Sequence, residues 1–578
     1  MIRKLARSIR ENIWAALLSP LCMVGEVYME VRIPRIIAML VDNGVTPGNI
    51  AVVWQQGLLL VLTALCSLVF GVGSAVFAAK AATGFSRNLR QDMFYRVQTF
   101  DFANIDKFST ASIITRLTSD VANIQMCFQM LIRMAVRCPV MIVLASISVF
   151  RLSPKLCMVY LIALPIMTLC LYILIRLVHP IFTRAFKTFD RLNNVTQENL
   201  HGMRVVKSFV RASREEEKFT EVSGTVHRDF SKAERLLALN SPVMQLTIYT
   251  CIIAISFLGA QMIVSSGNTS FTTGDLTSMF TYTTQILGGL MMLSMVFVFI
   301  TMSRAPMERC AELLWEEPQL RNPESPVTQV KDGSVDFENV CFRYSETATS
   351  NALESVNIHI ASGQTVGILG GTGSSKSTLV QLIPRLYDAT QGTVKVGGVD
   401  VKDYDLKALR DQVAMVLQKN TLFKGTIKDN LRWGDPNATD EEIEHACRLA
   451  CAHDFITAFP DGYDTMVEQE GKNVSGGQKQ RLCIARALLK KPKILILDDS
   501  TSAVDTRTDA SIRQAFVQEI PGITKLIIAQ RIASVQEADL ILVMDGGQVV
   551  AQGNHEMLLQ TSQIYREVYE SQVKGGEE

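Results

Sequence analysis

The chain has 578 residues, which is too long for one hydrophobic core and predicts up to about four domains, or fewer and larger ones. Hydrophobic residues make up 48% and charged residues 20%, so the composition excludes a disordered protein and favours a chain with a membrane part. The 57 lysines and arginines balance the 56 aspartates and glutamates, and this lack of cationic excess argues against a nucleic-acid partner.

The first part of the chain contains apolar runs of the length that crosses a bilayer, which is about 20 residues. Four of the six runs carry no charged residue, whereas Glu26, Glu30, Arg32 and Arg35 interrupt the first run. We therefore predict a transmembrane domain over residues 1–310. Its six spans are expected at about 13–38, 57–79, 130–150, 156–175, 243–264 and 276–303.

The distribution of cations predicts the orientation, because cytoplasmic loops carry the excess of lysine and arginine. The lead-in before the first span holds four cations, segment 80–128 holds six and segment 176–240 holds twelve, whereas the other three connections hold only Arg151 and Lys155. Both termini are thus expected in the cytoplasm of a multi-pass cell-membrane protein. The two long inner segments keep helical apolar spacing, so the spans should continue into the cytosol as helices.

The pattern changes after residue 310. Prolines punctuate a predicted linker at 311–334, and from 335 onward short runs rich in valine and isoleucine alternate with helical patterns. Alternation of this kind predicts a mainly parallel sheet covered by helices, and hence an α/β domain over residues 335–578. The clearest strands are expected at 365–369, 413–417, 494–497, 526–529 and 540–544.

A glycine-rich segment follows the first of these strands and opens a helix. It matches the phosphate-binding loop G-x-x-x-x-G-K-[ST] except that Ser375 stands where a glycine is usual. Backbone N–H groups and the helix start would face the phosphates, Lys376 would add a positive charge, and the hydroxyl of Ser377 could reach Mg²⁺. The side chain of Ser375 is expected to obstruct the phosphates or to restrict the backbone. The predicted nucleotide contacts are Gly370, Gly371, Thr372, Gly373, Ser374, Ser375, Lys376, Ser377 and Thr378.

Two further segments fit such a loop. The apolar strand at 494–497 ends in Asp498, which is the pattern for an aspartate that holds Mg²⁺ through water beside a phosphate-binding loop. Between the two lies Val474-Ser475-Gly476-Gly477-Gln478, where glycines at a helix start would form another anion-binding nest.

This combination resembles the ATP-binding cassette (ABC) family, and the resemblance covers the whole chain. Residues 474–478 differ at one position from the family's Leu-Ser-Gly-Gly-Gln signature. The resemblance implies that Tyr344 stacks on adenine, that Gln418 senses the γ-phosphate beside Mg²⁺, and that the loop at 502–505, with Asp505, crosses to the opposite subunit. Six spans before the cassette, with segments 115–120 and 199–207 between them, are similar to an exporter half-transporter.

In this family two cassettes enclose two ATP molecules, and each ATP lies between one chain's phosphate-binding loop and the other chain's signature. The signature residues Ser475, Gly476, Gly477 and Gln478 are therefore expected to hold the partner's ATP. The catalytic glutamate of active members is replaced here by Asp499, and the switch histidine is replaced by Gln530. A carboxylate shortened by one methylene loses about 1.5 Å of reach, and an error of that order can cost about a hundredfold in rate. Glutamine cannot carry a proton near pH 7.

The pattern resembles the degenerate chain of bacterial heterodimeric multidrug exporters. It implies an ATPase subunit that moves amphipathic or drug-like compounds outward by alternating access, with a second half-transporter as partner. The same residues also fit different assignments. Drift or engineered substitutions in a homodimer would produce the same changes, and the chain could be an ATP-gated channel, a regulatory subunit, or a lipid or peptide exporter.

Charges and thioethers mark a candidate transport path. Glu26 and Glu30 share a helix face, as do Arg133 and Arg137, so these groups either contact substrate or form a structural ion pair. The sixth span is rich in adaptable side chains that suit either a promiscuous cavity or ordinary packing. These are Met279, Met291, Met292, Met295, Met302, Phe280, Tyr282, Phe297 and Phe299.

A cluster of two histidines and two cysteines is the nearest approach to a metal site. On a helix, Cys447 and Cys451 share a face, but His445 and His453 lie roughly opposite. We therefore expect the cysteines to be small apolar helix residues and predict Mg²⁺, with ATP, as the metal cofactor.

Overall fold

The computed structural model describes residues 2–267, 270–345, 348, 350–499 and 504–574. The chain forms two compact units. The first consists of Met1–Gln98 and Thr110–Glu316, and the second of Thr99–Ser109 and Glu317–Glu578. The short segment Thr99–Ser109 thus leaves the first unit and packs with the second.

Six helical segments of the first unit are long and apolar enough to cross a membrane. At 1.5 Å per residue, the 49-residue helix α3 is about 74 Å long, more than twice the roughly 30 Å hydrocarbon core of a bilayer. The predicted fold class, a bundle of six membrane helices with long extensions, is confirmed. The helices of this unit are α1 (Ile2–Leu5), η1 (Ala6–Asn12), α2 (Ile13–Leu40), η2 (Val41–Val45), α3 (Ile50–Gln98), α5 (Thr110–Thr115), η3 (Arg116–Asp120), α6 (Val121–Leu152), α7 (Pro154–His201), α8 (Met203–Ser208), α9 (Ala212–Ala238), α10 (Asn240–Ser266) and α11 (Thr273–Trp315).

Local sequence sets the ends of the long helices. Ser153 caps α7, where its side chain accepts a hydrogen bond from the N–H of Leu156, and Pro154 follows at the first helical position. Gly267 ends α10 in a left-handed conformation at φ 61°. Thr272 and Asp275 form a reciprocal capping box at the start of α11.

Polar contacts between helices fix the packing of α2, α7 and α11. The Tyr282 hydroxyl donates to the carbonyl of Val31 at 3.0 Å, and Ser278 donates to the carbonyl of Pro34 at 2.6 Å. Tyr160 and Thr283 share a hydrogen bond of 2.6 Å. In lipid, where apolar burial alone does not hold helices together, such bonds help to fix the packing.

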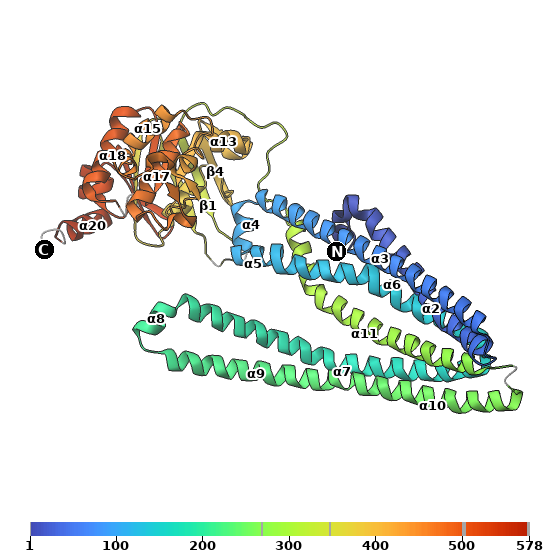
Figure 1. Cartoon of the computed structure of the whole chain (residues 1–578). Coiled ribbons are helices and arrows are strands. Elements are labelled where there is room, and N and C mark those ends of the chain that lie inside the picture. Colours follow the sequence, from blue (N-terminus) through green and yellow to red (C-terminus); the bar gives the residue numbers. More distant parts are fainter. Residues whose placement is uncertain (1, 268–269, 346–347, 349, 500–503, 575–578) are drawn as a thin grey trace. The chain divides into compact units, whose positions relative to one another are not determined.

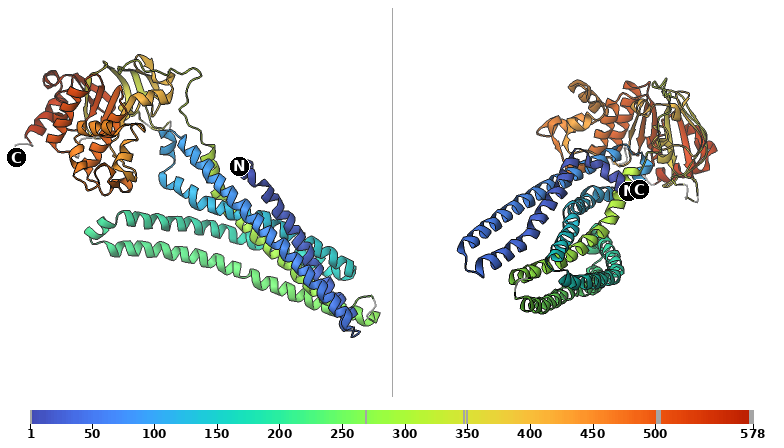
Figure 2. Two further views of the ribbon diagram at one scale, coloured as in Figure 1. Left: turned by 45° about the horizontal axis from the view of Figure 1, so that its top comes forward. Right: turned by 90° about the vertical axis from the view of Figure 1, so that its right-hand side faces the viewer.

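Helices α7, α9 and α10 form a long hairpin, with α8 at its tip (Figure 1, Figure 2). Beyond α8, Phe209 and Val210 are 72% and 84% exposed, and Val205 is exposed on α8 itself. The tip of the hairpin thus carries a cluster of exposed apolar side chains.

The second unit contains two main sheets. In the six-stranded sheet, with order β12-β11-β3-β10-β9-β6, all neighbours are parallel except β11 and β12. Each of the five expected strands overlaps one of these strands, and the predicted α/β fold is confirmed. The strands are β3 (Thr365–Gly370), β6 (Val413–Val416), β9 (Ile494–Asp498), β10 (Thr524–Ile528), β11 (Leu540–Asp545) and β12 (Gln548–Gly553).

The other main sheet is antiparallel, with order β2-β1-β4-β5. One apolar core lies between this antiparallel sheet and one face of the six-stranded sheet. A second apolar core lies between the six-stranded sheet and most of the helices of this unit. The strands of the antiparallel sheet are β1 (Val335–Phe342), β2 (Leu353–Ile360), β4 (Gln391–Val396) and β5 (Val399–Asp400), and β7 (Gly425–Thr426) pairs with β8 (Met466–Val467). The helices of this unit are α4 (Phe102–Lys107), α12 (Lys376–Gln381), η4 (Val401–Asp403), α13 (Leu406–Gln412), α14 (Ile427–Leu431), α15 (Asp440–Leu449), α16 (His453–Thr457), η5 (Gly462–Asp464), η6 (Gln469–Gly471), α17 (Gly476–Leu489), α18 (Thr506–Glu519), η7 (Ile532–Ser534), α19 (His555–Thr561) and α20 (Gln563–Lys574).

The N-cap residue of helix α4, Asp101, also binds the rest of the second unit. One carboxylate oxygen of Asp101 accepts from the N–H of Asn104, and the other accepts from the N–H groups of Gln319 and Leu320 at 2.6 and 3.1 Å. Tyr387 donates to Asp106 at 2.7 Å, and its ring lies 5.9 Å from that of Phe102. Burial and the neighbouring Asp106 raise the pKa of Tyr387.

Replacing Asp101 with alanine should release α4, because one cap and two hydrogen bonds to a carboxylate are lost together. Each such contact contributes about 1 kcal/mol or more, so amide hydrogen exchange at Asn104, Gln319 and Leu320 should accelerate by at least tenfold. The control is Asp403→Ala, whose side chain is exposed. Unchanged exchange at these three amides in Asp101→Ala would contradict the assignment.

Candidate nucleotide-binding site

The phosphate-binding loop lies between β3 and α12, as the sequence predicts. A Cβ atom on Gly370 would lie 2.3 Å from the carbonyl oxygen of Met544, so only glycine fits there. Gly373 and Ser375 both have positive φ, 85° and 69°. The backbone at Ser375 is therefore in the left-handed region that favours glycine, and the sequence-based concern about restricted angles is justified.

Replacing Ser375 with glycine should tighten ATP binding. The Cβ of Ser375 is expected to obstruct the phosphates, and its removal should lower the Kd by roughly fivefold, or about 1 kcal/mol. Binding of a fluorescent ATP analogue to the full chain in detergent micelles measures this change.

The neighbouring variant Ser374→Gly is the matched control. Ser374 is 4% exposed and its hydroxyl donates to the carbonyl of Gly371 at 2.9 Å, so its loss should weaken binding. If Ser375→Gly also binds more weakly than the native chain, the Cβ of Ser375 does not obstruct the phosphates.

The ammonium group of Lys376 lies at the centre of the loop. It donates to the carbonyls of Gly370 and Gly371 at 2.8 and 2.7 Å, and to Ser374 Oγ at 3.3 Å. Burial lowers the pKa of Lys376, and the nearby Asp498 and Asp499 oppose that effect. The group is thus a fixed positive charge where phosphate oxygens would be bound.

Ser377 and Asp498 provide a pair of oxygens beside the loop. The Ser377 hydroxyl donates to Asp498 Oδ1 at 3.0 Å, and Asp498 is 3% exposed at the end of β9. Burial raises the pKa of Asp498, and the Ser377 hydrogen bond opposes it. A hydroxyl and a carboxylate in contact suit Mg²⁺, which prefers oxygen ligands, so these two residues could hold the ion.

Gln418 lies at the same edge of the sheet. Strand β6 pairs in parallel with β9, with Val416 opposite Leu497, so the residues that follow both strands emerge together. Gln418 is two residues beyond β6 and is exposed. This edge therefore brings Gln418 to the side of Asp498 and Asp499, although none of the hydrogen bonds described for this chain joins their side chains.

Asp499 and Gln530 are in direct contact. Gln530 Nε2 donates to Asp499 Oδ2 at 3.3 Å, and the backbone of Asp499 donates to the carbonyl of Ile528. The two residues follow the neighbouring strands β9 and β10. The two substituted positions thus form one unit. The sequence assigns both to one site, but their direct contact depends on the pairing of β9 with β10.

Tyr344 lies beside α12. Its hydroxyl shares a hydrogen bond of 2.8 Å with Thr378, and its ring contacts those of Phe342 and Tyr387 edge-on. The residue is 52% exposed, so part of the ring is open for stacking. The sequence does not reveal Tyr387 as part of this site. It belongs to no local motif, and its ring contacts Tyr344 only because the chain folds.

The signature segment begins helix α17. The Ser475 hydroxyl accepts from the N–H of Gln478, and Gln478 Oε1 accepts from the N–H of Ser475, which gives a complete capping box. Ser475 and Gly476 are exposed and Gly477 is half-buried. Among the bonds and ion pairs described for this chain, none joins the segment to its own phosphate-binding loop.

The loop at 502–505 is described only in part. Ser502 and Ala503 lie outside the described residues. Asp505 caps α18 by accepting from the N–H of Thr508, and this hydrogen bond lowers the pKa of Asp505.

The histidine and cysteine cluster has other partners. Cys447 is buried, and His453 Nδ1 lies 3.0 Å from the Tyr463 hydroxyl. Over the described part of the chain, no three histidine, cysteine, aspartate or glutamate side chains form a metal-binding group.

The charges of the first span form a network across two helices. Arg137 on α6 donates to Glu26 and to Glu30 on α2, the latter at 2.6 Å. The sequence predicted the two shared faces but not which residues pair. Of the residues singled out on the sixth span, Met279 and Tyr282 are buried, whereas Met291, Met292, Met295, Met302 and Phe297 are exposed.

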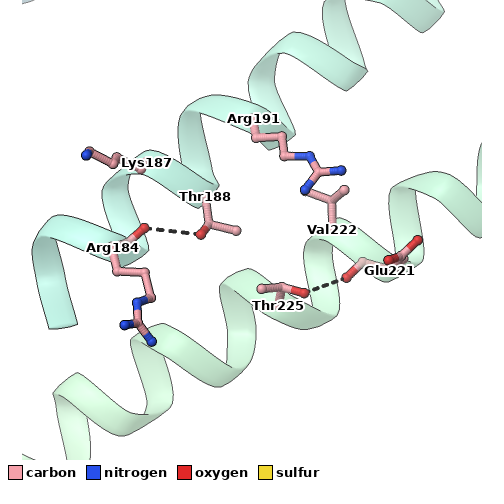
Figure 3. Close-up of a pocket in the computed structure, with 7 residues that line it drawn as sticks. All are labelled: Arg184, Lys187, Thr188, Arg191, Glu221, Val222 and Thr225. Carbon is pink, nitrogen blue, oxygen red and sulfur yellow. Dashed lines mark hydrogen bonds between the residues drawn. The ribbon is translucent and has the colours of Figure 1, made fainter.

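Two pockets lie along α7. One, of about 710 Å³, lies between α7 and α11 and is lined by Tyr172, Arg176 and Phe297 among other mostly apolar residues. The other, of about 200 Å³, lies between α7 and α9 (Figure 3). There Arg184 and Arg191 reach toward α9 and Lys187 points away, so the groove is basic and open to solvent.

The chain is similar to known proteins over nearly its whole length. Residues 17–300 match the family described as ABC transporter transmembrane region, and residues 353–502 match the family described as ABC transporter. The ABC transporter ATP-binding protein YfiB of Bacillus subtilis (strain 168) is 36% identical over 95% of both chains. Rv1273c of Mycobacterium tuberculosis (strain ATCC 25618 / H37Rv) is 34% identical over 93% of both. A bacterial Atm1-family ABC exporter solved with ATP bound superposes with a TM-score of 0.83 at 25% identity, covering 98% of both chains.

Proposed function

This chain belongs to the ABC transporter family, as a half-transporter with the exporter fold and an ATPase domain, and from that premise we propose that it is the weakly hydrolysing subunit of a heterodimeric exporter. Its own site would bind Mg-ATP and split it slowly. Its signature would complete the competent site of a second half-transporter.

Nucleotide binding by the chain's own site is supported by the intact part of the phosphate cradle. Lys376 is held at the loop centre, and Ser377 and Asp498 present adjacent oxygens. In this proposal Lys376 contacts phosphate oxygens, Ser377 and Asp498 hold Mg²⁺ partly through water, and Gln418 senses the γ-phosphate. Bound Mg²⁺ neutralises phosphate charge in the transition state.

The observation that carries the proposal is the Asp499–Gln530 pair. A general base must lie within about 2.6–3.2 Å of the proton that it takes, directly or through one water. The shorter side chain of Asp499 is retracted from that position, and its Oδ2 accepts a hydrogen bond from Gln530. Gln530 can donate to a phosphate oxygen but cannot transfer a proton near pH 7. Binding is thus retained while the hydrolytic step is weakened.

The signature supports a contribution to a partner. Its capping box orders the start of α17, and the glycine N–H groups there have no helical acceptor. Such an exposed helix start favours a phosphate supplied from outside the chain. Asp505, which caps α18 at the end of the crossing loop, would lie at the same interface.

Two exposed apolar surfaces also support a second half-transporter. The tip formed by α8, Phe209 and Val210 is one of them. The other is a pocket of about 360 Å³ in the second unit, flanked by the stacked and exposed rings of Phe423 and Trp433. In the proposed pair, the tip of each chain covers this pocket on the other.

The substrate class follows from the pocket between α7 and α11. Its apolar wall and its single cation, Arg176, suit an amphipathic or drug-like compound. The exposed methionines of α11 can adapt to ligands of different shape. We place both termini and the ATPase domain in the cytoplasm of a cell-membrane protein. With the exporter fold, this orientation means that transport runs out of the cell.

Hydrolysis-dependent accumulation in inverted membrane vesicles tests the function. Vesicles that contain this chain and its partner should accumulate a fluorescent amphipathic dye with ATP but not with a non-hydrolysable analogue. Flux down the gradient with the analogue alone would instead support an ATP-gated channel. If vesicles with this chain alone transport the dye uphill as fast as vesicles with both chains, the chain functions as a homodimer. Transport of lipids or peptides in place of the dye would support a lipid or peptide exporter.

A further inference from the structure

The charges inside the transmembrane unit are incompletely paired. Arg137 binds both Glu26 and Glu30, which leaves this group with one excess negative charge. Arg133, one turn away on the same face of α6, makes no hydrogen bond or ion pair to any residue that the structure describes. An unpaired charge within a membrane helix is costly and marks a functional position.

Two buried polar atoms in this group of charges lack hydrogen-bond partners in the part of the chain that the structure describes. Glu26 Oε2 and Arg133 Nε are both buried and have no hydrogen-bond partner among the described residues. Glu26 therefore binds Arg137 through one oxygen, and its other oxygen is a buried hydrogen-bond acceptor without a partner among the described residues. The Nε of Arg133 is a buried donor, so the two unpartnered groups have opposite polarity.

Both residues line one pocket of about 430 Å³ between α2, α3 and α6, which lie side by side (Figure 1, Figure 2). Its α3 wall is made mostly of small residues. A Cβ on Gly71 would lie 3.2 Å from the carboxyl carbon of Glu26, so glycine leaves room for that carboxylate. Leu68 and Val72, at 60% and 55% exposed, form an apolar margin. The remaining lining residues are Ala64, Ser67 and Ala75.

The pocket lies deep along the helices. The helical run that starts with α2 continues through η2 to Val45, so Glu26 and Arg133 each lie 19 residues, or about 28 Å, from the short-loop end of their helices. With a hydrocarbon core of roughly 30 Å, this level approaches the opposite head-group region. A polar head can reach the charges there while an alkyl chain stays in lipid.

We propose that this pocket binds the head of a zwitterionic amphiphile, with its anionic group on Arg133 and its ammonium group on Glu26. The apolar tail would lie along Leu68 and Val72. The assignment goes beyond the proposed export function, since binding requires no transport. The same chemistry could come from a resident phospholipid or from a transported compound.

Equilibrium binding to the full chain in detergent tests the proposal. The probe is radiolabelled palmitoyl-lysophosphatidylethanolamine, which carries both charges, and the competitors are hexadecyl phosphate and hexadecylamine, which carry one each. Because a hydrogen bond to a charged group is worth tenfold or more, the zwitterion should displace the probe at about one tenth of the concentration that either competitor needs. Equal displacement by all three would reduce the pocket to an unspecific apolar groove.

Variants locate the site. Arg133→Gln and Gly71→Leu should each weaken probe binding by about tenfold or more. Arg151→Gln, at the exposed end of the same helix, should not change it. If Gly71→Leu does not fold, as judged by gel filtration and thermal unfolding, Leu68→Trp narrows the pocket margin from an exposed position. If Arg133→Gln and the pocket-filling variant both bind the probe as tightly as the native chain, the proposal is overturned. Arg133 and Glu26 would then form a structural ion pair bridged by water.

Adding Mg-ATP distinguishes a resident phospholipid from a transported compound. Adding Mg-ATP with the partner subunit should release a transported amphiphile, whereas a resident lipid should remain bound. Either result supports the pocket, because each requires Arg133-dependent binding. Loss of transport with intact probe binding would instead contradict only the export function.

Discussion

Replacing Asp499 with glutamate and Gln530 with histidine should raise the ATPase rate of the purified chain by about a hundredfold. The glutamate regains about 1.5 Å of reach toward the attacking water, and an error of that size costs roughly this factor. The histidine restores a group that can carry a proton near pH 7. Because the two side chains contact each other at 3.3 Å, the gain should exceed the sum of the single-variant gains. Steady-state phosphate release measures it.

The control for this gain is the triple variant that also carries Lys376→Met. It should return to the background rate, since the ammonium at the centre of the loop is gone. If the double variant binds ATP but hydrolyses it no faster than the native chain, weakened hydrolysis does not originate in these two residues.

Replacing Gly477 with glutamate should lower the ATPase rate of the assembled heterodimer by at least a hundredfold. A negative charge at the first turn of α17 would repel the partner's ATP, and contacts to transferring phosphate are worth several orders of magnitude in rate. The helix itself should remain folded, because an acidic residue near a helix N-terminus is stabilising. ATP binding by this chain's own loop should be unchanged.

The matched control is Gly522→Glu, at an exposed glycine where an added Cβ meets no atom within 4 Å. This variant should keep the native rate. A Gly477→Glu heterodimer that turns over normally would show that the signature of this chain does not serve the productive site.

Much of the fold follows from local sequence. The six apolar runs and the strand before Gly370 are recognisable because each places its pattern within one element. The phosphate-binding loop, Asp498 and the signature were identified in the same way. Their roles rest on residue types at fixed spacing, and the fold places the loop and Asp498 together because β3 and β9 both pair with β10.

Contacts between distant segments could not be predicted. Asp101 binds the linker at Gln319 and Leu320, and the ring of Tyr344 contacts that of Tyr387 from a distant segment of the chain. The contact between Asp499 and Gln530 depends on the register of β9 and β10 rather than on any motif. Similarly, the sequence shows that Arg133 and Arg137 share a face, but only the packing of α2 on α6 shows that Arg137 takes both glutamates.

The proposed function requires above all that this chain holds ATP without splitting it efficiently. The most direct test is to load the purified full chain with Mg²⁺ and radiolabelled ATP, remove unbound nucleotide, and identify what is retained. We expect intact ATP at about one molecule per chain, with slow phosphate release at about one hundredth of the rate of the Asp499→Glu/Gln530→His variant. Retained ADP with rapid phosphate release, shared equally by two copies of this chain, would contradict the proposed function.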